Sequence, residues 1–122
     1  MIPIETIAAL LSQVARGEQC FRTVASLSDW RFLVNGYEIC IFDDAGECDY
    51  VEWAIDPNGK KTTYEEWFIA AQPLWSVQNY NPRDRNDELE GRKLFKAIDP
   101  IALLSPADHL ALEALMDREL RP

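Results

Sequence analysis

The dipeptide Asn35-Gly36 constrains the fold of this chain more than any other feature of the sequence. It separates two segments rich in apolar and aromatic residues, 30–34 and 37–42. Both of its positions tolerate the positive φ angles that a two-residue type I′ turn requires. The sequence therefore predicts a β-hairpin in which Val34 is opposite Tyr37 and Phe32 is opposite Ile39.

This register sorts the side chains of both strands onto two faces, because side chains alternate along a strand. One face carries Leu33, Glu38, Cys40 and Phe42. The other, more uniformly apolar face carries Phe32, Val34, Tyr37, Ile39 and Ile41. We expect the second set to lie against helices and Glu38 to lie on the opposite face.

Turn signals downstream of this hairpin predict a meander of three or four antiparallel strands. Residues 43–46 break the second strand, residues 50–55 resume the alternation, and residues 56–59 form another turn. The alternation favours Trp53 inward and Tyr50 outward. Thr63 and Glu66 have the spacing of a capping box, which predicts a short helix over 64–71 that Pro73 ends; a fourth strand is the alternative.

Helical signals occur at both ends of the chain. Residues 4–14 have apolar side chains at helical spacing, and Gly17 follows as a stop. Residues 99–104 predict a short helical turn, and Ser105-Pro106 provides an N-cap before a helix over 107–120. The polar stretch 76–93 predicts an exposed loop. We therefore expect one α+β domain over 1–122, in which an N-terminal helix and C-terminal helices cover one face of the sheet.

Acidic residues are concentrated in the predicted meander. Residues 32–59 contain seven acids and no base, while the whole chain has a formal net charge of −9. A fixed acidic face repels nucleic acid and attracts a basic protein, so we expect no direct binding to nucleic acid. The residues predicted to contact a partner are Asp43, Asp44, Glu47, Asp49, Tyr50 and Glu52.

Signatures of catalysis and of cofactor binding are missing from the sequence. His109 is the only histidine, and its neighbours favour a solvent-facing or packing role. Cys40 resembles a core residue, whereas Cys48, in a polar turn, would be reactive only beside a cation. The acids do not have EF-hand spacing, and the glycines form no phosphate loop. We expect no cofactor and no metal.

The cysteine count and hydropathy predict the compartment. Three cysteines are an odd number, which favours free thiols in a reducing compartment. The longest apolar run is far shorter than the roughly 20 residues that span a bilayer. We therefore expect a cytoplasmic protein without a membrane anchor.

The leading hypothesis for function is a small acidic inhibitory or interaction protein. Examples are a toxin-neutralising immunity protein and a phage-type counter-defence protein, whose carboxylates would occupy the basic site of a toxin or of a nucleic-acid-binding complex. The alternative is a small enzyme or a ligand- or metal-binding domain that uses the acidic cluster from Asp43 to Asp49. A homo-oligomer with a structural role, and an acidic face that only maintains solubility, also fit the sequence.

Three segments resemble a family of short uncharacterised proteins of pseudomonads and their relatives. They are residues 34–50 (VNGYEICIFDDAGECDY), 56–60 (DPNGK) and 99–105 (DPIALLS). The resemblance covers most of the chain except 75–96, which looks like an insertion. It implies the fold and a bacterial accessory origin, but no activity. Members of that family carry extra cysteines where this chain has Ala45, Val51 and Ala54, so a shared metal site is not implied.

Overall fold

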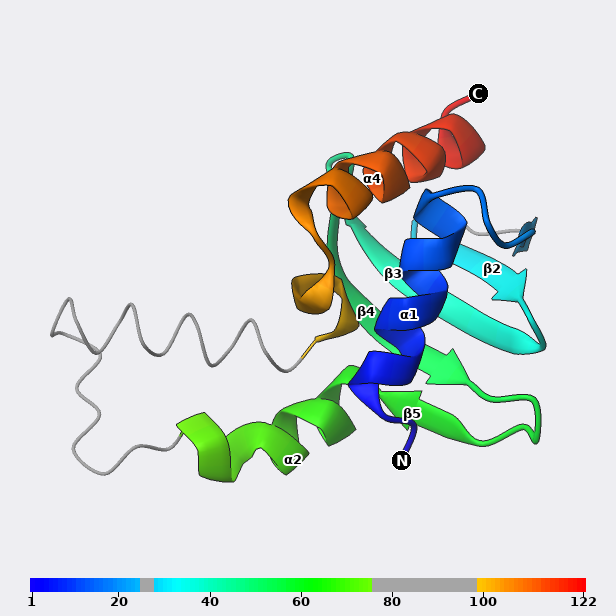
Figure 1. The fold of residues 1–122 in the computed structure, drawn as a ribbon. Coiled ribbons are helices and arrows are strands. Elements are labelled where there is room, and N and C mark those ends of the chain that lie inside the picture. The colour runs from blue at the N-terminus through cyan, green and yellow to red at the C-terminus, as the bar shows by residue number, and fades with distance from the viewer. Residues whose placement is uncertain (25–27, 76–98) are drawn as a thin grey trace, which may run out of the picture.

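The computed structural model describes residues 1–24, 28–75 and 99–122, which form a five-stranded antiparallel sheet with helices packed on it (Figure 1). The strands are β1 (Arg22–Val24), β2 (Trp30–Val34), β3 (Tyr37–Asp44), β4 (Glu47–Ile55) and β5 (Lys61–Thr63), paired in that order. The helices are α1 (Ile4–Ala15), α2 (Tyr64–Trp75), the 3-10 helix η1 (Pro100–Leu103) and α4 (Pro106–Leu120). The predicted α+β class is therefore confirmed, with five strands in place of three or four. The loop predicted over 76–93 lies outside the described residues.

The hairpin formed by β2 and β3 has the predicted register. Val34 pairs with Tyr37 and Phe32 pairs with Ile39, around a turn in which Asn35 has φ 48° and Gly36 has φ 80°. Phe32, Val34, Ile39 and Ile41 are almost completely buried, and Tyr37 packs against the same core. The apolar face of the hairpin lies against the helices, as the alternation predicted.

Two irregularities in the pairing of β3 with β4 change the side-chain alternation of β4. Cys40 pairs with Trp53, but the next residue, Ile41, pairs with Val51, so Glu52 is an extra residue in β4. Such a bulge places two successive side chains on the same side of the strand. Trp53 therefore shares the outer face with Cys40, and the prediction that it points inward is wrong. The buried residues of β4 are instead Cys48, Val51 and Ala54.

The helix predicted after β5 is present and longer than expected. Thr63 and Glu66 form the capping box, since Thr63 N donates to Glu66 Oε1 at 3.2 Å and Glu66 N approaches Thr63 Oγ1 at 3.4 Å. The helix α2 runs to Trp75, so Pro73 does not end it. Proline removes only one backbone donor there, two residues before the end of the helix.

One hydrophobic core joins the helices to the inner face of the sheet. Figure 1 shows α1 lying across that face, with α4 at one end and α2 at the other. The buried side chains of α1 and α4 include Ile7, Leu11, Leu112 and Met116. Asp108 links the two helices, because its carboxylate accepts hydrogen bonds from Ser12 Oγ at 2.8 Å and Arg16 Nε at 3.1 Å.

None of the helices in the described part of the chain combines the length and apolarity needed to span a membrane.

Candidate binding site

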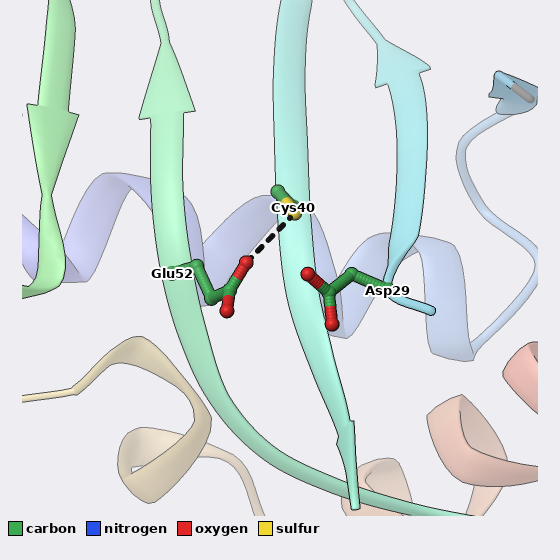
Figure 2. A group of neighbouring side chains, drawn as sticks. All are labelled: Asp29, Cys40 and Glu52. Carbon is green, nitrogen blue, oxygen red and sulfur yellow. Dashed lines mark hydrogen bonds between the residues drawn. The ribbon is translucent and has the colours of Figure 1, made fainter. Parts of the chain in front are cut away.

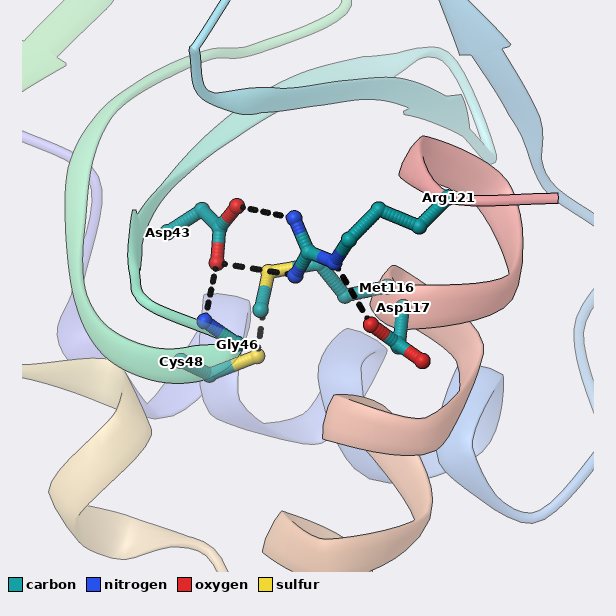
Figure 3. A network of polar contacts seen from close by, with 6 residues as sticks. All are labelled: Asp43, Gly46, Cys48, Met116, Asp117 and Arg121. Atoms are coloured by element: carbon teal, nitrogen blue, oxygen red, sulfur yellow. Dashed lines mark hydrogen bonds and ion pairs between the residues drawn. The ribbon is translucent and has the colours of Figure 1, made fainter.

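The carboxylate of Asp43 forms an ion pair with Arg121. Arg121 reaches it from just beyond α4, with Nη1 at 2.8 Å from Oδ2 and Nη2 at 3.3 Å from Oδ1 (Figure 3). Gly46 N also donates to Asp43 Oδ1 at 2.9 Å. The hydrogen bonds from Arg121 hold the pKa of Asp43 below its usual value, against the effect of partial burial. Asp43 is thus an ion-paired residue that fastens the β3–β4 hairpin to α4.

Glu52 lies on the outer face of the sheet, apart from the tip of the β3–β4 hairpin. Figure 2 shows three side chains that point toward one another: Glu52 from β4, Cys40 from β3, and Asp29 from the residue before β2. Cys40 Sγ donates to Glu52 Oε2 at 3.4 Å. Burial, and then the hydrogen bond with Asp29, raise the pKa of Glu52 above its ordinary value. Glu52 therefore holds its proton more strongly than a free carboxyl group would.

The residues Asp29, Cys40 and Glu52 are also a possible set of metal ligands, since one ligand atom from each lies within 4.8 Å of the others. A thiolate with two carboxylates would suit a divalent ion such as zinc. However, burial is the first cause of a pKa for Cys40 far above its ordinary value. The thiol is accordingly a protonated donor to Glu52 Oε2, and a metal ion would have to displace that proton.

Basic residues from outside the acidic stretch neutralise part of the outer face. Arg31 Nη2 lies 2.7 Å from Glu38 Oε1. The guanidinium of Arg31 and the ammonium of Lys61 lie over the Trp53 ring, at 5.5 and 4.7 Å from its centroid. The outer face is therefore mixed in charge, and the acidic character is concentrated at the tip of the β3–β4 hairpin.

Three of the predicted contact residues remain exposed at this tip. Asp44, Glu47 and Asp49 have solvent-exposed side chains. Within residues 1–24, 28–75 and 99–122, no ion pair joins any of them to a basic side chain. These three residues, which we call the acidic tip, are available to a basic partner.

A cleft of about 680 Å³ lies beside the acidic tip. Residues of β4 and the first residue of α2 form one part of its wall, and η1 with the first half of α4 forms the rest. Its described lining contains no lysine or arginine. The lining residues are Glu47, Cys48, Asp49, Tyr50, Tyr64, Asp99, Ile101, Ala102, Leu104, Pro106, His109 and Glu113.

Tyr50 and Tyr64 form the aromatic part of the cleft. Their ring centroids are 4.7 Å apart, and Tyr50 also stacks on Phe42 at 5.2 Å. Tyr50 therefore lies on the outer face, as predicted, but it is half-buried between two rings. Burial is the first cause of the raised pKa of both phenols, and the carboxylates of Asp49 and Asp99 add to it. The described lining of the cleft is therefore acidic, with four carboxyl groups, those of Glu47, Asp49, Asp99 and Glu113.

Asp99 is the most buried carboxyl group in the lining, with 6% of the residue exposed. Its Oδ2 accepts from Val51 N at 2.9 Å and its Oδ1 accepts from Ile101 N at 2.7 Å, so it caps η1 and joins it to β4. Burial raises its pKa to about 7, although both backbone donors favour the charged form. No basic side chain in the described ranges is paired with it.

His109 and Glu113 attach α4 to β4 in the wall of the cleft. His109 Nε2 lies 3.1 Å from Cys48 O and 3.0 Å from Glu113 Oε1. Glu113 Oε1 in turn accepts from Cys48 N at 3.2 Å. Since both neighbours of Nε2 are acceptors, this nitrogen carries a proton. His109 is half-buried, and it positions the cleft wall.

The structure thus separates the six predicted contact residues. Glu47, Asp49 and Tyr50 line the cleft, Asp44 is exposed at the same tip, Asp43 is paired with Arg121, and Glu52 is on the outer face. Cys48, predicted in a polar turn, is buried against Met116, with Sγ 3.7 Å from Sδ. Its pKa is raised to about 12, chiefly by burial, so it is not a reactive thiol.

Sequence reasoning did not identify Asp99, Tyr64 and Glu113 as members of a site. The Asp99-Pro100 pair does identify the N-cap of η1, since aspartate accepts hydrogen bonds from the first N–H groups of a helix. No local pattern shows that the same carboxylate reaches Val51, which is 48 positions earlier.

Comparison of the chain with models of protein families, with curated proteins and with solved structures gives no match. The expected relationship to a pseudomonad family therefore stays a prediction.

Proposed function

We propose that this protein binds a basic protein partner through the acidic tip and the adjoining cleft, and that it acts as an inhibitor of that partner. The observation that carries the proposal is the exposed, unpaired state of Asp44, Glu47 and Asp49 beside a cleft whose described lining has no basic residue. The neighbouring Asp43, in contrast, is paired with Arg121. A toxin-neutralising immunity protein or a phage-type counter-defence protein would work in this way.

Such a surface requires no catalytic group in order to act. Clustered charge accelerates encounter with an oppositely charged partner and rejects partners of the same charge. Salt weakens this attraction between exposed charges, because the Debye length falls to about 8 Å at physiological ionic strength. The proposed function therefore predicts an association rate that decreases as salt increases.

The test compares two triple variants with the same change in net charge. The first, D44N/E47Q/D49N, removes the acidic tip; the second, E5Q/E18Q/E65Q, removes three exposed acids elsewhere on the described surface. Proteins captured from cells by the unmodified chain are identified by mass spectrometry, purified, and measured for association rate against salt.

We expect the first variant to lose the partner and the second to retain it. Equal binding by both variants, or an association rate that does not change with salt, would contradict the proposed function.

A further inference from the structure

The cleft contains a buried carboxyl group, that of Asp99, which is paired with no basic side chain among residues 1–24, 28–75 and 99–122. Asp99 is 6% exposed, and it accepts hydrogen bonds from the neutral N–H groups of Val51 and Ile101. A buried charge in a folded protein is usually paired with an opposite charge. Two backbone donors use about half of the acceptor capacity of a carboxylate, so Asp99 retains positions for a further donor.

The other groups around this carboxylate favour a cation with a flat face. The Tyr64 ring lines the same cleft and is supported by the Tyr50 ring, 4.7 Å away between centroids, and cations bind above aromatic rings. Asp49 and Glu113 place two more carboxylates on the lining. A guanidinium suits this set better than an ammonium, because it is planar, stacks on aromatic rings and has five donors directed to several acceptors.

The size of the cleft permits more than a bare ion. Ligand pockets in proteins commonly measure 300 to about 1,000 Å³, and this one measures about 680 Å³. The apolar part of its lining includes Ile101, Leu104 and Pro106, which could contact the methylene groups of a long side chain.

From the buried carboxylate, the two tyrosines and the volume, we infer that this cleft receives one arginine side chain of the basic partner. The inference rests on the proposed function and extends it: the acidic tip attracts the partner, and the cleft selects an arginine on it. The guanidinium would lie against the Tyr64 ring and donate to Asp99 and Asp49, which supplies an opposite charge that no side chain in the described ranges provides.

The experiment uses a small probe, so that it does not depend on knowing the partner. N-acetyl-arginine methylamide is titrated into the ¹⁵N-labelled protein while NMR follows the amide signals of Val51 and Ile101, whose N–H groups donate to Asp99. The matched neutral probe is the citrulline analogue, and the lysine analogue tests the choice of cation. We expect both to bind at least about tenfold more weakly than the arginine probe.

A pair of variants links the binding to the cleft. Tyr64→Leu removes the π-system and keeps an apolar side chain, whereas Glu65→Gln changes an exposed neighbour outside the lining. We expect the first to weaken arginine binding about tenfold and the second to leave it unchanged. A thermal melt of each variant shows whether the fold is retained.

Equal binding of the arginine and citrulline probes, or of the arginine and lysine probes, would overturn the inference. So would arginine binding that is unaffected by Tyr64→Leu in a folded protein. If the probe fails but partner capture still requires the acidic tip, the proposed function stands and the arginine pocket does not.

Discussion

The buried carboxyl group of Asp99 should make the stability of this protein fall as pH rises from acid to neutral. Burial raises its pKa to about 7 in the folded chain, from an ordinary value of 3.8, and Asp49 adds to the effect. The folded state therefore binds this proton more tightly than the unfolded state. The stability that Asp99 contributes is fully present below about pH 4 and is lost as pH rises through about 7. At about 1.36 kcal/mol per pH unit, the interval between the two values gives a loss of about 4 kcal/mol.

Substitution of Asp99 by Asn isolates this effect, because an amide does not titrate. The amide oxygen can replace only one acceptor, so either Val51 N or Ile101 N would face an NH₂ group. Leaving that donor unsatisfied costs about 1–3 kcal/mol. We expect Asp99→Asn to be less stable than the unmodified protein at pH 4, and the difference to shrink or reverse by pH 8.

Urea unfolding at steps between pH 4 and pH 8 measures both proteins. Asp108→Asn provides a control that should not change across this range. Hydrogen bonds from Arg16 and Ser12 hold the pKa of Asp108 below its usual value of 3.8, so its stabilisation is present above about pH 4 and is lost only at lower pH. The difference in stability between Asp108→Asn and the unmodified protein should therefore stay constant from pH 4 to pH 8. If the stability curves of the unmodified protein and Asp99→Asn stay parallel across this range, the reasoning about Asp99 is refuted.

Two further predictions concern the hairpin turn and the cysteines. Gly36→Val and Gly59→Val both force a β-branched residue into positive φ, at a cost of roughly 1 kcal/mol or more. A Cβ at Gly36 would also lie 3.2 Å from Pro57 Cγ, whereas a Cβ at Gly59 would have no atom within 4 Å. Urea unfolding should therefore show a larger loss for Gly36→Val, together with weaker partner binding; a variant as stable as the unmodified protein would contradict the hairpin register. A thiol reagent at pH 8 should label Cys20 rapidly, and it should label the buried Cys40 and Cys48 only after unfolding. Rapid labelling of two thiols in the folded protein would contradict the burial of Cys40 and Cys48.

The sequence was sufficient where the determinants of structure are local. The Asn35-Gly36 turn fixes its own φ angles, and the register of β2 and β3 follows from it residue by residue. The Ser105 N-cap and the capping box at Thr63 are likewise complete within a few residues, which is why both helix starts were predicted. In contrast, the bulge at Glu52 is a feature of the pairing between β3 and β4, and no local pattern in the sequence marks it. A strict alternation therefore placed Trp53 on the wrong face.

The candidate site depended even more on distant residues. The acids from Asp43 to Glu52 look equivalent in sequence, but Arg121, 78 positions away, neutralises Asp43. Glu52 meets Asp29, a residue that no local pattern connects to it. The cleft arises only when β4, η1 and α4 are packed together, so its buried carboxylate at Asp99 has no signature in the sequence beyond a helix cap.

The ion pair between Arg121 and Asp43 has a consequence for the biosynthesis of the protein. A ribosome that adds roughly 5–20 residues per second needs roughly 4–16 seconds to pass from Asp43 to Arg121, 78 residues later. During that interval the nascent hairpin carries its carboxylates without the guanidinium that fastens it, and the cleft lacks its α4 wall. A partner that requires the cleft would therefore not be captured by a growing chain until α4 had left the ribosome.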